Sequence, residues 1–299
     1  MGWLNCSMTS HAIERSKPGG VGGFLTFIRF SHTVFALPFA LGSMFAAAGG
    51  LPTWRVFSGV LAAMVFARTA AMTFNRLADW ELDKRNPRTE GRHRLVGRGP
   101  AIAACTVSSL GFVMSAWWLN PLCAWLSPAA LAIVFFYSLT KRFTHFAQFF
   151  LGLALSVAPV GAWLAVTGSF AWPPLVLALA VLLWVAGFDV IYATQDYDVD
   201  VREGLKSLVV WLGIRGGLRL AVALHAAAFA GLVAFGYVAG LGRFYSGALA
   251  IVIAGLAYEH FEARRGDIAS INRAFFQANA AVGLAFVLGV LFDRLAFAP

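Results

Sequence analysis

Long apolar runs, separated by short polar stretches, follow one another along the chain from residue 24 to residue 296. Each run holds about 20 residues, the length that an α-helix needs to cross the hydrocarbon core of a bilayer. Glycine, proline or charged residues separate the runs. The predicted spans are residues 24–48, 55–78, 101–119, 122–140, 147–167, 173–195, 217–239, 244–262 and 275–296. We therefore expect an all-α, polytopic transmembrane bundle of about nine helices.

The composition supports a membrane protein. The mean hydropathy is +0.74, 60% of the residues are hydrophobic and only 12% are charged, which excludes an ordinary soluble domain. Residues 1–23 have no apolar core typical of a signal peptide, so we expect a cytoplasmic N-terminal tail before one membrane domain, 24–299. The cysteines, Cys6, Cys105 and Cys123, show neither disulfide nor metal-site spacing.

The charge distribution predicts the orientation. The chain has 23 Lys and Arg against 14 Asp and Glu, a net charge of +9. A basic chain can bind nucleic acid, but here the basic residues flank membrane spans, so we expect no nucleic-acid partner. With a cytoplasmic N-terminus, 19 of the 23 lie in the N-terminal region or near cytoplasmic ends of spans; Arg55, Arg243 and Arg294 lie outside and Arg68 lies within a span. The positive-inside rule favours this orientation.

Two sets of polar residues end the second and sixth predicted spans. We call Asn75, Asp79 and Asp83 the first ladder, and Asp189, Tyr192, Asp196 and Asp200 the second ladder; together they hold five of the 14 acidic residues. A charged side chain at the centre of a membrane helix costs about 2.5–3.5 kcal/mol on insertion scales, so such residues usually serve function. The predicted topology brings both ladders to the cytoplasmic face.

Helical geometry selects among the acids. At about 100° per residue, the first ladder forms one stripe, with Arg68 on nearly the same face one heptad deeper, and the second ladder falls within an arc of about 80°. Glu81 and Asp198 point away and are weaker candidates. Hard oxygen ligands on facing helices suit Mg²⁺, which often bridges to substrate phosphates. The alternative for either ladder alone is a solvated helix end.

Cations near the ladders could neutralise a diphosphate. Lys141 and Lys206 are the first candidates for phosphate contacts, followed by Arg142. The loop after the first ladder adds Lys84, Arg85, Arg88, Arg92, Arg94 and Arg98, which could instead only enforce topology and touch anionic lipid. His32 and His145 have no metal-site spacing.

The two ladders resemble the Asn-x-x-x-Asp-x-x-x-Asp and Asp-x-x-Tyr-x-x-x-Asp-x-x-x-Asp motifs of the UbiA superfamily of intramembrane prenyltransferases. Ser31–Phe39, Tyr137–Thr144 and Glu203–Ser207 are also similar to the family, and the spans match its nine-helix plan. One departure is Arg92-His-Arg-Leu95-Val-Gly97, which lacks the proline usual in Arg-x-x-Pro-x-Gly and so puts the acceptor specificity in doubt.

The resemblance implies a site that holds two Mg²⁺ ions bridged by the diphosphate of a polyprenyl donor. The implied metal ligands are Asn75, Asp79, Asp83, Asp189, Asp196 and Asp200. The implied catalytic residues are the five aspartates of the ladders and Tyr192, which would orient a carboxylate or face the allylic carbon. The implied contacts to diphosphate or acceptor are Asn75, Arg68, Lys141, Arg142, Lys206, Arg92 and Tyr137.

We therefore expect an Mg²⁺-dependent enzyme of a bacterial cytoplasmic membrane, with its active site on the cytoplasmic face. It would move a polyprenyl group to a ring carbon of an aromatic acid. The acceptor best matched by the resemblance is 4-hydroxybenzoate, in ubiquinone-type biosynthesis; a naphthoate-type acceptor of the menaquinone (futalosine) route is the alternative. We expect contact with membrane lipid and no obligate protein partner. A cation or proton transporter is the different-class alternative and would need acids near the midplane with a path to both faces. A non-catalytic lipid-binding subunit would not need both ladders.

Overall fold

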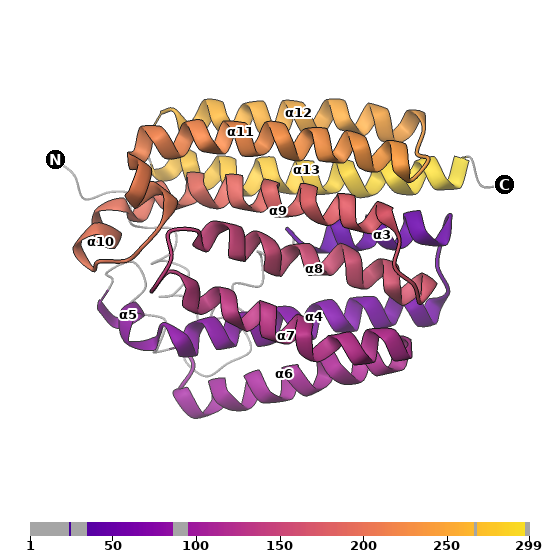
Figure 1. The fold of residues 1–299 in the computed structure, drawn as a ribbon, viewed down its shortest axis with the longest axis horizontal. Coiled ribbons are helices and arrows are strands. Elements are labelled where there is room, and N and C mark those ends of the chain that lie inside the picture. Colours follow the sequence, from indigo (N-terminus) through magenta and orange to yellow (C-terminus); the bar gives the residue numbers. More distant parts are fainter. Residues whose placement is uncertain (1–23, 25–34, 86–94, 266–267, 297–299) are drawn as a thin grey trace.

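The computed structural model describes residue 24 and residues 35–85, 95–265 and 268–296. These residues form a helical bundle without strands (Figure 1). The main helices are α3 (Leu37–Ala48), α4 (Trp54–Ala78), α6 (Arg98–Leu119), α7 (Pro121–Thr140), α8 (Ala147–Thr167), α9 (Trp172–Ala193), α11 (Leu208–Val238), α12 (Arg243–Ala263) and α13 (Ile268–Ala296). Short helices α5 (Trp80–Arg85), η3 (Thr194–Asp196) and α10 (Tyr197–Arg202) follow α4 and α9.

The structure confirms the all-α membrane bundle. Among the described residues, eight helices are long and apolar enough to cross a bilayer, and α3 is a shorter apolar helix of 12 residues. Most of the first half of the predicted span 24–48 lies outside the described residues, as does Arg92. An all-round apolar helix is stable in lipid because its backbone hydrogen bonds are satisfied internally.

The seventh predicted span begins too late. We predicted residues 217–239, but α11 begins at Leu208, where the Ser207 hydroxyl accepts a hydrogen bond from Val210 N at 3.1 Å and caps the helix. Gly213 breaks the helix internally with φ 71° and ψ 165°, a conformation that glycine adopts without steric cost. The arginines near this break lower the local hydropathy, so a hydropathy-based prediction missed the beginning of the helix.

The helices pack in two connected groups that meet at α8. Helices α3, α8, α9, α11, α12 and α13 form one group, and α4, α6 and α7 form the other. In Figure 1, α11, α12 and α13 lie on one side of α9, whereas α4, α6 and α7 lie beyond α8 on the opposite side. The largest fully buried side chains, including Phe39, Trp184 and Phe286, lie in the first group.

Close packing of α8 on α9 depends on a glycine. A Cβ atom added to Gly152 would lie 2.4 Å from the backbone oxygen of Leu182, closer than any real contact of this kind. Small residues at such positions let membrane helices approach closely and gain van der Waals contact. This contact holds α8 against α9 within the first group, and α8 in turn contacts α7 of the second group.

The polar segments gather at one end of the bundle. Figure 1 shows α5 and α10 at the same end, together with the α7–α8 connection and the segment before α11. The other end carries Arg55, Arg243 and Arg294 among short connections. The first and second ladders therefore lie at the same end of the molecule.

Candidate active site

Each ladder crosses a break between two helices. Asp79 lies between α4 and α5 with φ −94° and ψ 12°, and Asp196 lies before α10 with φ −100° and ψ 4°. Both residues adopt the sparsely populated bridge conformation that recurs at active sites. The ladders were predicted from the geometry of continuous helices, whereas the structure interrupts the regular helix at the middle aspartate of each ladder.

The ladders face each other across one cavity of about 350 Å³, which we call the carboxylate cavity. The predicted site residues that line it are Arg68, Asn75, Asp79, Asp83, Tyr137, Lys141, Asp189, Tyr192, Asp196, Asp200 and Lys206. Arg142 is exposed at the margin, where its guanidinium donates to the carbonyl of Ala78. Arg92 lies outside the described residues, so its predicted contact stays a prediction.

Cations pair with the first ladder. The Nζ atom of Lys141 lies 2.6 Å from Oδ2 of Asp79, and a guanidinium nitrogen of Arg142 lies 3.6 Å from Oδ1 of the same residue. Arg76 lies 3.6 Å from Asp83, and both side chains are largely buried. These pairs offset the cost of placing carboxylates in a poorly hydrated site.

The segments that carry the two lysines are joined to each other. The backbone N–H of Lys206 donates to the carbonyl of Lys141 at 3.0 Å, and Lys206 Nζ donates to the carbonyl of Phe143 at 3.4 Å. The buried Gln148 side chain accepts from Leu208 N at 3.4 Å. These bonds hold both lysines beside the ladders.

The acids that helical geometry set aside do not line the cavity. Glu81 pairs with Lys84 at 3.0 Å on an exposed part of α5, and Asp198 is exposed on α10. They lie on the same short helices as ladder residues, which makes them matched controls for substitutions of the ladders.

Several lining residues were missed by the sequence analysis. Arg76 neighbours Asn75 in the chain and was passed over, although its spacing of seven residues from Asp83 could have indicated the pair. Phe35, Phe188 and Phe275 form an aromatic wall with Tyr192, and the ring centroids of Phe275 and Tyr192 are 4.7 Å apart. No local signal separates these phenylalanines from the many others in the chain.

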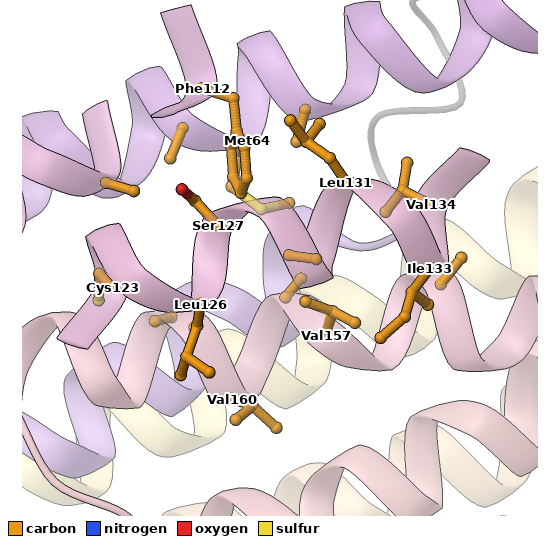
Figure 2. Close-up of a pocket in the computed structure, with 18 of the residues that line it drawn as sticks. Met64, Phe112, Cys123, Leu126, Ser127, Leu131, Ile133, Val134, Val157 and Val160 are labelled. Atoms are coloured by element: carbon orange, nitrogen blue, oxygen red, sulfur yellow. The ribbon is translucent and has the colours of Figure 1, made fainter. Parts of the chain in front are cut away.

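A second cavity, of about 340 Å³, adjoins the first and is lined almost entirely by apolar side chains from α4, α6, α7 and α8. We call it the apolar chamber. Figure 2 shows Leu126, Ile133 and Val134 from α7 and Val157 and Val160 from α8 around it. Arg68, Tyr137 and Leu155 line both cavities and mark the junction between them. A charged cavity beside an apolar one suits an amphiphile with an anionic head.

A protein-family model matches the chain that forms these two cavities. The model of the UbiA prenyltransferase family matches residues 36–290, which cover nearly all of the described helices. The chain belongs to this family. The resemblance seen in the ladders is thereby confirmed, and the chain is an integral membrane protein of a prenyltransferase family.

Two relatives are similar to this chain over most of its length. It is 34% identical over 259 residues to the 4-hydroxybenzoate octaprenyltransferase of Alkalilimnicola ehrlichii, which covers 85% of this chain and 87% of the relative. It is 33% identical over 253 residues to the enzyme of the same name from Vibrio parahaemolyticus, with coverages of 82% and 87%. The match spans both ladders rather than an isolated motif.

Solved structures show the same fold. The apo structure of a UbiA homologue from Aeropyrum pernix superposes with a TM-score of 0.80 at 32% identity, covering 88% of this chain and 98% of that one. A UbiA homologue from Archaeoglobus fulgidus, solved with GPP and Mg²⁺, gives a TM-score of 0.68 at 19% identity, covering 90% and 99%. This chain therefore has the fold of the UbiA homologues.

The donor set fits Mg²⁺ held jointly by protein and substrate. Among the described residues, no three His, Cys, Asp or Glu side chains lie close enough to form a complete metal cage. Mg²⁺ does not need one, because it usually takes one or two carboxylates and completes its shell with water and phosphate oxygens. Asp79 Oδ1 is buried, pairs with Arg142 at 3.6 Å, and accepts no hydrogen bond from the residues that the structure describes. Asp79 lines the carboxylate cavity, so its carboxylate could serve as one of these ligands.

Proposed function

We propose that the protein transfers a polyprenyl group from its diphosphate to a ring carbon of 4-hydroxybenzoate. The observation that carries this proposal is the junction of a carboxylate cavity with an apolar chamber at Arg68, Tyr137 and Leu155. The diphosphate head would occupy the first cavity and the isoprenoid tail the second. The names of the relatives from Alkalilimnicola and Vibrio support 4-hydroxybenzoate as the acceptor.

Mg²⁺ would be held by the ladders. The residues with suitable oxygen ligands at the cavity are Asn75, Asp79, Asp83, Asp189, Asp196 and Asp200. Two ions, one for each ladder, would divide these ligands, and the Archaeoglobus homologue solved with GPP and Mg²⁺ supports the use of this metal. Bound there, the ions supply Lewis-acid stabilisation of negative charge on the departing diphosphate.

The residues of the chain provide the other components of the reaction. Lys141 and Lys206 place positive charge beside the diphosphate, which leaves with the electron pair of the breaking C–O bond. Phe188, Tyr192 and Phe275 present aromatic rings to the cavity, and such rings stabilise a developing allylic cation. The apolar walls exclude water that would otherwise capture that cation.

The acceptor would bind at the junction. The guanidinium of Arg68 can pair with the carboxylate of an aromatic acid, and Tyr137 lies on the same boundary between charge and apolar surface. A ring carbon of the acceptor then bonds to the allylic carbon, and loss of the ring proton restores aromaticity. A naphthoate-type acceptor shares this chemistry and is the alternative that an acceptor screen separates.

We propose that the end with the carboxylate cavity faces the cytoplasm of a bacterial cell. Lys84, Lys141, Arg142, Lys206, Arg264 and Arg265 lie at that end of the described helices. The opposite end carries far fewer basic residues, which supports this orientation. The transport alternative is disfavoured, because the cavity that continues from the carboxylates into the bundle is lined almost entirely by apolar side chains of the described residues.

The decisive experiment is a prenyl-transfer assay of the protein purified in detergent with Mg²⁺. Geranyl diphosphate and longer donors would be offered with 4-hydroxybenzoate or with a hydroxynaphthoate. We expect a prenylated 4-hydroxybenzoate and its loss in Asp79→Ala and Asp196→Ala. Glu81→Ala and Asp198→Ala are the matched controls and should retain activity. Full activity in both ladder variants would refute the two-ladder site, and turnover with the naphthoate alone would reassign the acceptor.

A further inference from the structure

A second group of buried polar side chains lies behind α9, on the side away from α8. It consists of His225 on α11, Glu259 and His260 on α12, and Asn279 on α13. His225, Glu259 and Asn279 are almost completely buried and do not line either cavity. Polar groups inside a membrane bundle are costly, so their retention usually reflects function or specificity.

His225 attaches α11 to the backbone of α9. Its Nε2 atom lies 3.2 Å from the carbonyl oxygen of Trp184, which can only accept, so Nε2 carries the proton. In the neutral ring Nδ1 is then the acceptor, and His260 Nε2, 2.9 Å away, donates to it. One imidazole therefore bridges three helices in a single fixed tautomer.

The imidazole lies directly against the part of α9 that leads to the second ladder. A Cβ atom added to Gly187 would lie 2.3 Å from His225 Cδ2, so only glycine allows the ring to approach the helix there. Gly187 is two residues before Asp189. The position of the ring thus fixes the height and rotation of α9 just before its first ladder carboxylate.

Asn279 attaches the aromatic wall to the same cluster. Its side-chain amide donates one hydrogen bond to Glu259 Oε1 at 3.0 Å and another to the carbonyl of Phe275 at 2.7 Å. Phe275 in turn packs on Phe188 and Tyr192, with centroid distances of 5.2 Å and 4.7 Å. The cluster therefore bonds to the backbones of α9 and α13, which carry Phe188, Tyr192 and Phe275 of this wall.

The cluster is not optimised for stability. Glu259 Oε2 and Asn279 Oδ1 are buried and have no hydrogen-bond partner among the described residues, and Glu259 Oε2 lies 3.9 Å from His225 Nδ1. Unsatisfied buried acceptors destabilise a fold, whereas directional bonds between helices specify one register among several apolar packings.

We propose that His225, Glu259 and Asn279 form a positioning cluster that fixes the register of α9 against α11, α12 and α13 and so holds Asp189, Tyr192 and Phe275 in place at the carboxylate cavity. None of the three touches substrate. The inference rests on the proposed function, because its catalytic consequence is the placement of the second ladder for Mg²⁺ and diphosphate.

The test compares substitutions of His225 with a buried hydrogen bond elsewhere. His225→Leu removes both bonds of the ring, whereas His225→Gln keeps an N–H that can reach Trp184. Ser43→Ala is the control, since the Ser43 hydroxyl is fully buried and donates to Pro159 O at 2.6 Å between α3 and α8. Asn279→Leu is the second variant should His225→Leu fail to fold.

We expect His225→Leu to lower kcat about tenfold or more and to raise the Mg²⁺ concentration for half-maximal activity, as loss of supporting partners does in other metal sites. His225→Gln should keep kcat and the Mg²⁺ concentration for half-maximal activity close to their wild-type values. Ser43→Ala should lower only the midpoint of thermal unfolding. Normal kcat and Mg²⁺ dependence in folded His225→Leu and Asn279→Leu would overturn the proposal.

Amide hydrogen exchange measures the local stability of α9 without requiring enzyme turnover. Exchange in residues 186–193 should rise in His225→Leu and stay unchanged in Ser43→Ala. If the wild-type protein transferred no prenyl group while this difference persisted, the proposed function would fail and the positioning role would stand. Equal exchange in the two variants would overturn the positioning role.

Discussion

Lys141 Nζ lies 2.6 Å from Asp79 Oδ2, so a cation proposed to bind diphosphate is paired with a carboxylate proposed to bind metal. Asp79 is 5% exposed and Lys141 is 34% exposed, which leaves the lysine free to turn toward an arriving anion. Metal on the carboxylate and phosphate on the lysine would replace this pair by two stronger ones. The pair thus keeps both partners at the cavity before the substrate arrives.

The role of Lys141 is tested by its replacement with methionine, which keeps most of the length of the side chain and removes its charge. A hydrogen bond to a charged group contributes about 1.5–3 kcal/mol, so we expect kcat/KM for the prenyl diphosphate to fall by about tenfold to a hundredfold. Lys84→Met removes an equivalent lysine that pairs with Glu81 outside the cavity and should have little effect. Equal losses in steady-state kinetics of the two variants would contradict a phosphate contact by Lys141.

The metal requirement should depend on the ladder acids and not on their neighbours. Asp200 lines the carboxylate cavity, whereas Asp198 lies exposed two residues earlier on α10. We expect Asp200→Asn to raise the Mg²⁺ concentration for half-maximal activity about tenfold or more, given that even outer partners of metal ligands have effects of this size. A Mg²⁺ titration after removal of metal by EDTA measures it. Asp198→Asn should follow the wild-type curve, and a shift in that variant alone would argue against the second ladder as the metal site.

The apolar chamber can be narrowed at one glycine. Gly161 on α8 lines the chamber, and a Cβ atom added there meets no other atom within 4 Å. Gly161→Leu should therefore fold normally and extend into the chamber, which lowers kcat/KM for long polyprenyl donors more than for geranyl diphosphate. Gly247→Leu, on an exposed part of α12 with equally open surroundings, is the control. Assays with donors of several lengths measure the ratio, and an unchanged ratio in Gly161→Leu would place the tail elsewhere.

The contact between α8 and α9 predicts a stability effect. Gly152→Ala would place a methyl group against the backbone oxygen of Leu182 and force the helices apart. Overpacking of this kind costs about 1–3 kcal/mol, so we expect a lower midpoint of thermal unfolding in detergent. Gly247→Ala meets no neighbour and should raise the midpoint slightly, since alanine is favoured over glycine within a helix by about 0.5–1 kcal/mol. A drop of the same size in both variants would rule out the helix contact as the cause.

Hydropathy and residue spacing predicted much of this molecule because a lipid-facing helix must be apolar over its length. The polar positions that remain, such as Asp79 and Asp196, then stand out against a simple background. The residues at four-residue spacing around Asp79 line one cavity with those of the second ladder. The spacing could not reveal the bridge conformation of Asp79 and Asp196, because neither proline nor glycine marks the two breaks.

Hydropathy and residue spacing could not predict contacts between distant parts of the chain. Phe275 is one of 27 phenylalanines, and only the packing of α13 against α9 brings its ring to Tyr192. His225 and Asn279 occupy apolar helices where a single polar residue carries no indication of its partner. Arg76 follows Asn75 directly, and its ion pair with Asp83 depends on the bend between α4 and α5. Tertiary packing, which has no local signature, decides all of these.

The backbone hydrogen bond from Lys206 N to Lys141 O affects how a diphosphate can enter the cavity and how pyrophosphate can leave it. It joins the α7–α8 connection to the segment before α11, so these two segments border the cavity together. A diphosphate that arrives, or a pyrophosphate that departs, cannot pass by separating these two segments without breaking that bond.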